Sequence, residues 1–223
     1  MCGRFTVRMD PQESAREFGV AKTDGAYTPS FNVAPAQKIP VVFIQDGQRV
    51  MDAFQWGLIP SWAKDPAIGN KLINARAETV AEKPSFRQAF LRRRCLILAD
   101  GFYEWKLEGT RKRPVHITLK DRSGFAFAGL WERWQSPEGG VVNSCTIITT
   151  EANAFMRAIH HRMPVILPKE SEDAWLDPAN TDRESLLSIL VPYPPDLMQA
   201  VFVSTHVNRP GNDGPECVLP FDE

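Results

Sequence analysis

The sequence predicts a strand-rich α+β fold, and three observations support this class. Its 18 prolines are spread along 223 residues, which favours many loops and short elements over a helical bundle. Apolar runs rich in β-branched residues recur between turn residues and predict strands. Helical spacing and capping signals are confined to short stretches. With 43% hydrophobic residues and six tryptophans, the chain can bury a sizeable core.

A short helix is predicted near the start of the chain. Asp10 precedes Pro11 and fits the N-cap position, while Glu13 completes a capping box. Gly19 then suits the C-terminal cap. Four further helical patterns follow at 86–91, 152–157, 172–176 and 183–190, the last one opened by a capping box from Thr181 to Glu184.

Strands are predicted from apolar runs, and two pairs of runs carry a hairpin signal between them. A glycine that follows Asp or Ser between two such runs is typical of a tight turn. The predicted hairpins join 41–44 to 50–54 across Asp46-Gly47, and 116–119 to 125–128 across Ser123-Gly124. Buried strands are also predicted at 95–99, 145–149 and 201–203.

The charge balance restricts how this protein could contact nucleic acid. Its formal net charge is −1, which argues against a wholly basic nucleic-acid coat, so any such contact must be local. Two basic clusters, at 92–94 and 111–113, are interpreted as solvated faces or loops.

Cysteine spacing argues against a disulfide scaffold and against a zinc site. Cys2, Cys95, Cys145 and Cys217 are far apart, without a C-x-x-C pair or a histidine at zinc-finger spacing. We expect free thiols, no metal and no cofactor. The chain shows no signal peptide, and no apolar run approaches the roughly 18 residues of a membrane span. A cytoplasmic or nucleoid location is therefore expected.

Cys2 would carry two reactive groups once Met1 is removed, and its small side chain permits removal by a methionine aminopeptidase. The freed α-amine has an unperturbed pKa of roughly 7.7 to 8.0, so part of it is neutral and nucleophilic at pH 7. That amine can add to an aldehyde to give a Schiff base, and the adjacent thiol can then close a thiazolidine ring. A cysteine at this position does not establish such chemistry by itself.

Seven sequence blocks, taken in order, resemble a known family. They are MCGRF at 1–5, FNVAP at 31–35, WGLIPSW at 56–62, INARAET at 73–79, ADGFYEWK at 99–106, IHHRMPVIL at 159–167 and VN...NDGPE ending at Glu216. Together they span nearly the whole chain and resemble the SOS-response-associated peptidase family, the abasic-site-processing proteins. The resemblance implies one domain over residues 1–223, with a curved, barrel-like antiparallel sheet core and short peripheral helices.

The resemblance also implies a function. Such a protein senses abasic sites in single-stranded DNA or at a single-strand/double-strand junction, and crosslinks the open-chain aldehyde to Cys2. The other matching catalytic positions are Asn74, Glu104 and His160. Glu104 would move protons to and from the reacting groups, Asn74 would orient the N-terminus, and His160 would donate a proton during sugar ring opening or contact a phosphate. His161 is assigned no role.

A set of DNA contacts follows from the same resemblance. The implied phosphate ligands are Arg4, Arg76 and Arg162, and the residues implied to shape the groove are Asn32, Pro35, Trp105, Lys106 and Thr149. Trp105 is the candidate for stacking on an exposed base. Trp62 and the other tryptophans are expected in the core or groove wall. No wedge residue is assigned, and the protein is expected to act as a monomer.

Three other functions were weighed against this one. An N-terminal-nucleophile amidotransferase would also use Cys2, but 223 residues leave no room for the synthase domain that such glutaminases feed. A thiol peptidase would pair Cys2 with His160; a narrower version would only release Met1 from the chain itself. The third is a reader of modified bases that binds without a covalent step.

Overall fold

Five long strands form a closed, barrel-like ring in the computed structural model, which describes residues 2–25 and 27–221. In ring order they are β11 (Val141–Glu151), β10 (Phe125–Gln135), β7 (Arg94–Ala99), β4 (Lys38–Gln45) and β5 (Gln48–Trp56). Neighbours are antiparallel except β5 and β11, whose parallel pairing closes the ring. The short strands β2 (Lys22–Thr23), β6 (Asn74–Arg76), β12 (Arg162–Pro164) and β13 (Ile166–Leu167) extend this sheet.

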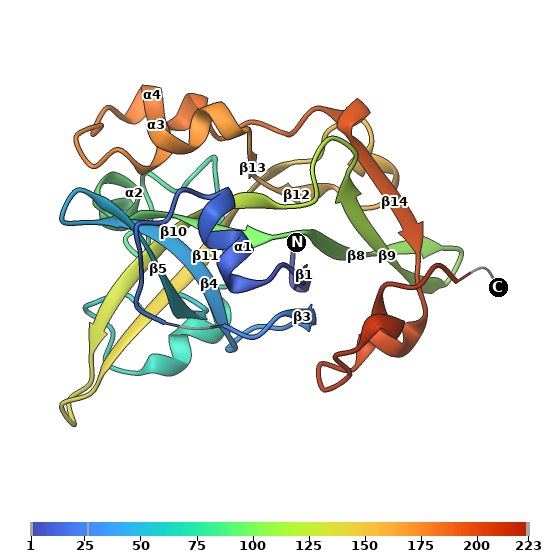
Figure 1. Cartoon of the computed structure of the whole chain (residues 1–223), viewed down its shortest axis with the longest axis horizontal. Coiled ribbons are helices and arrows are strands. Elements are labelled where there is room, and N and C mark those ends of the chain that lie inside the picture. The colour runs from blue at the N-terminus through green and yellow to red at the C-terminus, as the bar shows by residue number, and fades with distance from the viewer. Residues whose placement is uncertain (1, 26, 222–223) are drawn as a thin grey trace.

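A second, antiparallel sheet lies beside the barrel (Figure 1). Its order is β14 (Met198–Phe202), β9 (Arg111–Leu119), β8 (Gly101–Glu108), β1 (Phe5–Val7) and β3 (Ser30–Val33). The strand-rich α+β class and the barrel-like sheet core are thus confirmed. The β5–β11 pair departs from a purely antiparallel sheet, as do the short strands β2 and β6, which pair in parallel with β5 and β11.

The first strand is anchored by an aromatic cluster between the two sheets. The Phe5 ring meets Trp56 of β5 and Phe127 of β10 edge-on, with centroids 5.1 and 5.8 Å apart. All three side chains are fully buried. Burying a ring of this size contributes roughly 2 to 3 kcal/mol. This contact therefore fixes where the residues just before β1 lie.

Short helices surround the sheets. They are α1 (Pro11–Glu17), α2 (Arg87–Arg92), α3 (Glu172–Leu176) and α4 (Arg183–Ser188), with 3₁₀ turns η1 (Pro66–Lys71), η2 (Met156–Ala158), η3 (Lys169–Ser171), η4 (Pro195–Leu197), η5 (Thr205–Asn208) and η6 (Pro215–Cys217). The first predicted helix is confirmed, because the Asp10 side chain accepts hydrogen bonds from the amides of Gln12 and Glu13. Gly19 follows α1 with a φ of 61°, as a C-terminal cap requires.

The predicted hairpin across Asp46-Gly47 is confirmed. Both turn residues have positive φ, 50° and 76°, which matches a two-residue hairpin turn between β4 and β5. The hairpin predicted across Ser123-Gly124 is wrong. Strand β9 pairs with β8 and β14, whereas β10 pairs with β7, β11 and β13, so the intervening segment carries the chain from one sheet to the other.

Gly124 in this segment packs against the Met9 side chain, whose flexible sulfur end would have to shift to admit a Cβ. Two helix predictions also need correction. The pattern at 152–157 yields only η2, and α4 is capped by Asp182 rather than Thr181, since the Asp182 side chain accepts from the Ser185 amide.

Candidate active site and nucleic-acid interface

Cys2 lies just before β1 and is fully buried. The Asn74 side-chain nitrogen donates to the Cys2 carbonyl oxygen at 2.8 Å. Asn74 begins β6, which runs parallel to β11 with Asn74 opposite Ile147. The sheet therefore holds this amide against the start of the chain. The side-chain oxygen of Asn74 is buried without a hydrogen-bond partner among the described residues.

Glu104 approaches Cys2 from the second sheet. Phe5 pairs with Phe102, and the Tyr103 amide donates to the Arg4 carbonyl at 2.9 Å, so the next residues of β8 run alongside the start of the chain. Glu104 is only 4% exposed, and burial raises the pKa of its carboxyl group. Burial and the neighbouring Glu104 carboxylate together raise the pKa of the Cys2 thiol, which is therefore protonated at neutral pH.

His160 follows η2, where its amide donates to the Met156 carbonyl at 2.8 Å. Its Nδ1 lies 3.1 Å from the Arg162 amide nitrogen and 3.2 Å from the Arg162 carbonyl oxygen. Burial lowers the pKa of His160, and the charges of Lys112 and Arg162 lower it further. A neutral imidazole at pH 7 can accept from the amide at Nδ1 and carry its proton on Nε2.

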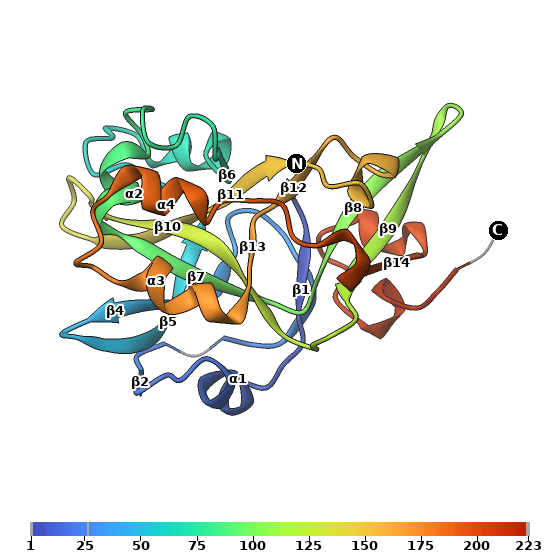
Figure 2. The same cartoon turned by 90° about the horizontal axis from the view of Figure 1, so that it is seen from above.

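His161 lies against this histidine, although sequence reasoning assigned it no role. The two imidazole rings of His160 and His161 have centroids 4.3 Å apart and planes inclined by 30°. The charge of Glu104 acts on His161 and opposes the lowering of its pKa by His160. The histidine pair therefore lies within electrostatic reach of the carboxylate beside Cys2. In Figure 2, β6 and β12 lie beside β11, with which both pair, and β8 lies to their right.

Arg4 and Asn32 belong to one internal network. Arg4 Nη1 donates to the Asn32 side-chain oxygen at 2.7 Å and to the Val207 carbonyl at 2.8 Å. The buried Asn32 amide also donates to three carbonyls of the segment after β14, those of Val207, Arg209 and Asn212. This pair thus secures the C-terminal segment, a function that sequence reasoning did not find.

Trp105 lies at the rim of the same network. Its Nε1 donates to the Asn208 side chain at 2.8 Å, and the Arg4 guanidinium lies 5.9 Å from its ring centroid. Pro35 lies in the turn after β3, half-buried. Lys106 forms a 3.2 Å ion pair with Glu108.

Arg162 is held by a carboxylate that sequence reasoning missed. Its two terminal nitrogens donate to the Glu78 carboxylate at 2.6 and 3.1 Å, and one also donates to the Thr149 carbonyl at 2.7 Å. Arg76 lies opposite Thr149 in the β6–β11 pairing, with an exposed side chain. The hydrogen bond from Arg162, aided by the charge of Arg76, lowers the pKa of Glu78. Two arginines thus converge on one acidic group.

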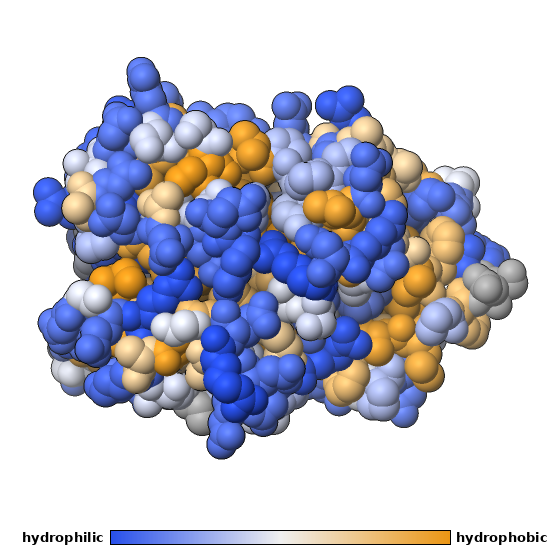
Figure 3. Space-filling model, turned by 45° about the horizontal axis from the view of Figure 1, so that its top comes forward, coloured by the Kyte–Doolittle hydropathy of each residue, from blue (hydrophilic) through white to orange (hydrophobic). Residues whose placement is uncertain are grey.

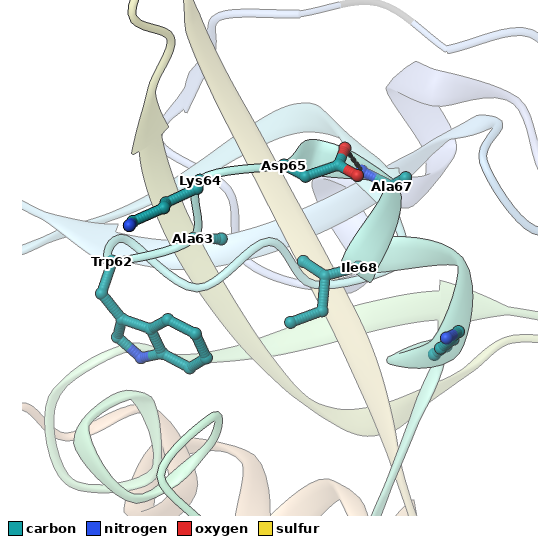
Figure 4. A pocket seen from close by; sticks show the side chains of 7 residues that line it. Trp62, Ala63, Lys64, Asp65, Ala67 and Ile68 are labelled. Carbon is teal, nitrogen blue, oxygen red and sulfur yellow. Dashed lines mark hydrogen bonds between the residues drawn. The ribbon is translucent and has the colours of Figure 1, made fainter.

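Two hollows flank this region. One, of about 450 Å³, is lined by Leu72, Asn74, Arg76, Thr79, Lys83, Pro84, Ser85 and Phe86. The other, of about 310 Å³, surrounds η1 and is shown in Figure 4, where the Asp65 side chain accepts from the Ala67 amide at 2.8 Å. Trp62 lines this second hollow and is 59% exposed, so it lies outside the core as part of a wall.

The four cysteines are free and buried, as expected. No group of three or more metal-ligating side chains occurs in the part of the chain that the structure describes. Within the same part, no helix is long and apolar enough to cross a membrane.

The chain matches the SOS response associated peptidase (SRAP) family model over residues 1–210. The chain belongs to that family. It is 49% identical to the abasic site processing protein YoqW of Bacillus subtilis over 221 residues, 98% of this chain and 99% of the relative. It is 33% identical to the abasic site processing protein HMCES of Gallus gallus, over 89% of this chain and 68% of the relative.

Solved structures show the same fold. A crystal structure of a Bacteroides thetaiotaomicron protein superposes with a TM-score of 0.90 at 29% identity, covering 99% of this chain and 100% of the other. A Bordetella bronchiseptica protein reaches a TM-score of 0.79 at 26% identity, over 91% of this chain and 100% of the other.

Proposed function

We propose that this protein processes abasic sites in DNA and captures them covalently in single strands or at single-strand/double-strand junctions. The capturing groups are the α-amine and thiol of Cys2 after removal of Met1. The observation that carries the proposal is the burial of Cys2 between two functional side chains, the Asn74 amide that binds its carbonyl and the Glu104 carboxyl. The names of the relatives, abasic site processing proteins, support the substrate.

The first step joins nitrogen to the sugar. An abasic deoxyribose in its open form has an aldehyde at C1′, and the neutral amine of Cys2 adds to that carbon to give a carbinolamine. Glu104 accepts a proton from the amine and returns one to the hydroxyl, which leaves as water. The raised pKa of Glu104 suits both directions of this transfer. The product is a Schiff base.

The second step joins sulfur to the same carbon. The Cys2 thiol adds across the C=N bond, its proton passes to the nitrogen, and a five-membered thiazolidine ring results. Because burial keeps this thiol protonated, the thiol itself supplies the proton that the nitrogen takes up. Ring closure is intramolecular and gains a high effective concentration. His160, neutral at pH 7, assists ring opening of the sugar from its Nε2.

Peptidase chemistry on other proteins is less compatible with the site than covalent capture of an abasic sugar. A thiol protease requires a thiolate, stabilised by a neighbouring cation that lowers the thiol pKa. Here burial and Glu104 raise the pKa of the Cys2 thiol. We propose that any peptidase activity is limited to releasing Met1 from the chain itself.

A denaturing gel tests the proposal directly. Mature protein is mixed with a single-stranded oligonucleotide that contains one abasic site, and a heat-stable shifted band is expected. Cys2→Ala should abolish the band, and Asn74→Ala and His160→Ala should slow its formation. Cys217→Ala, which removes another buried thiol, should leave the band intact. A chain that retains an N-terminal tag should form none.

Mass spectrometry locates the adduct. The expected mass gain lies on the N-terminal peptide of the mature chain and equals the oligonucleotide fragment minus one water. An adduct on a lysine, or release of glutamate from glutamine without any crosslink, would overturn the proposal. Tight binding to the abasic oligonucleotide without a covalent band would indicate a non-covalent reader instead.

A further inference from the structure

Capture by Cys2 requires an aldehyde carbon and no other part of the DNA. The α-amine and the thiol both bond to that carbon, and the Glu104 carboxyl exchanges protons with the groups on it. Asn74 donates to the Cys2 carbonyl oxygen at 2.8 Å, so it holds the protein chain rather than the substrate. These contacts are made within the chain itself. An aldehyde without any attached nucleotide therefore meets the complete set of reacting groups.

The Cys2 side chain is restrained in a way that favours ring closure. It is fully buried within the main hydrophobic core, and its Sγ lies 3.9 Å from the Arg4 carbonyl oxygen. The same carbonyl accepts from the Tyr103 amide at 2.9 Å, which ties it to β8. A thiol held close to the reacting carbon loses little further freedom when the ring closes.

Glu104 distinguishes this site from a cysteine at the end of a free peptide. In the peptide, the proton transfers that form and dehydrate the carbinolamine depend on water. In the protein, a carboxyl group that is only 4% exposed lies beside Cys2, and burial raises its pKa. It can therefore both give and take protons closer to neutral pH. General acid–base catalysis by a positioned group contributes about a hundredfold or more.

Burial also limits the size of a free aldehyde that can react. Cys2 is fully buried and Glu104 is nearly so, which leaves little room around the reacting groups. An abasic sugar brings the binding energy of its DNA strand to reach such an enclosed position, whereas a free aldehyde has no remote contacts to use. The smallest aldehydes therefore fit the site best, and a bulky aromatic aldehyde does not.

We infer that the mature protein also captures free one- and two-carbon aldehydes, such as formaldehyde and glyoxal, as a thiazolidine on Cys2, and that this capture blocks the site for abasic DNA. The inference rests on the proposed function, because it uses the same two groups of Cys2. With formaldehyde, nitrogen and sulfur each lose one hydrogen and bond to the same carbon, and the carbonyl oxygen leaves with both hydrogens as water. The protein gains one carbon atom, and no primary amine remains to attack an abasic sugar.

Mass spectrometry measures this capture. Mature protein and a free peptide of residues 2–6 are treated with the same low concentration of formaldehyde, and the gain of one carbon atom at the N-terminus is followed over time. The protein should react about a hundredfold faster than the peptide, and Glu104→Gln should react at about the rate of the peptide. Cys217→Ala, which removes another buried thiol, should keep the native rate. An unchanged melting temperature shows that each variant is folded.

Two further measurements test size selection and blocking. Benzaldehyde should modify the peptide and leave the N-terminus of the protein unmodified. Protein that formaldehyde has capped to different extents is then mixed with a single-stranded abasic oligonucleotide. The fraction of crosslinking that is lost should equal the capped fraction.

Three results would overturn the inference. One is a protein that reacts with formaldehyde no faster than the peptide, and another is equal reactivity of the protein with benzaldehyde and formaldehyde. The third is crosslinking that survives complete capping of Cys2. Failure of the proposed function gives a different result, since untreated protein would then form no crosslink with abasic DNA, whatever its rate with formaldehyde.

Discussion

Glu104 has an environment unlike that of most glutamates, which remain in water. Its side chain lies on strand β8 beside Cys2 and is only 4% exposed. This burial raises the pKa of the carboxyl group. A raised pKa keeps part of the population protonated nearer to neutral pH, so the same group can donate as well as accept a proton. The pKa of His160 shifts in the opposite direction, because burial and nearby cations lower it and keep the imidazole neutral.

These directions determine the pH dependence of crosslinking. The rate should rise with pH as the Cys2 amine loses its proton, around its unperturbed pKa of roughly 7.7 to 8.0. At lower pH the rate should fall further as the Glu104 carboxylate, whose pKa is raised by burial, takes up a proton and can no longer accept one from the amine. Single-turnover rates across pH 5.5 to 9.5 measure this rise.

Glu104→Gln isolates the acid–base contribution. The variant should crosslink about a hundredfold more slowly, because general acid–base catalysis is worth at least that much. Its rate should still rise as the Cys2 amine loses its proton, but the contribution of the carboxylate to the pH profile should be lost. A pH profile and rate unchanged in Glu104→Gln would show that another group moves the proton. His160→Asn should lower the rate without moving the midpoint of the rising limb.

Sequence reasoning finds individual reactive residues more readily than their partners. Cys2, Glu104 and Asn74 could be nominated because each has a chemical use and stands in a recognisable block. Glu78 could not, because its partner Arg162 is 84 residues away and no local pattern links the two. Asn32 was nominated as a groove residue, but its structural partners could not be found, because its acceptors lie 175 to 180 residues further on.

At the scale of elements, one buried arginine ties two short helices, α2 and α3, and the loop after α3 to the barrel. Arg94 begins β7 and is 5% exposed, although it belongs to a cluster that sequence reasoning interpreted as a solvated face. Its guanidinium donates to five backbone carbonyls, those of Phe90, Leu91, Trp175, Asp177 and Asn180. The ends of α2 and α3 are satisfied by this single side chain.

Removing that side chain should therefore cost much stability. Arg94→Ala leaves several buried carbonyls without a donor, and we expect the free energy of unfolding to fall by at least about 3 kcal/mol. Urea denaturation measures the change. Arg92→Ala is the control, because Arg92 is exposed. Its loss should change the free energy of unfolding by no more than about 0.5 kcal/mol. Equal effects of the two variants would contradict the assigned role of Arg94.

Local turn chemistry explains which elements could be predicted. The hairpin across Asp46-Gly47 depends on positive φ at both residues. This conformation is one that an Asp-Gly pair favours, so the residue types predict it. The chain at Ser123-Gly124 has a similar composition but crosses between sheets, because each flanking strand finds stronger pairing elsewhere. The parallel β5–β11 pairing that closes the ring joins residues far apart in the sequence. No short stretch of sequence can therefore predict it.

For the whole molecule, a net charge of −1 means that DNA affinity must come from a few cations near the site. Figure 3 shows a largely hydrophilic face with apolar side chains in separate patches. On the proposed DNA path Arg76 is exposed and open to a phosphate, and Arg162 would exchange Glu78 for one, whereas Arg4 is held by Asn32 and Val207 inside the fold.

This small number of cations sets the salt dependence of binding. Each phosphate contact on a single strand contributes a slope of about −0.7 in log affinity against log salt concentration, so the two contacts of Arg76 and Arg162 give about −1.4. Fluorescence anisotropy with the Cys2→Ala variant measures binding without crosslinking. Arg76→Ala should reduce the slope by about 0.7. Arg4→Ala should weaken the fold more than it changes the slope, and a slope steeper than about −4 would mean that a larger basic surface is in use.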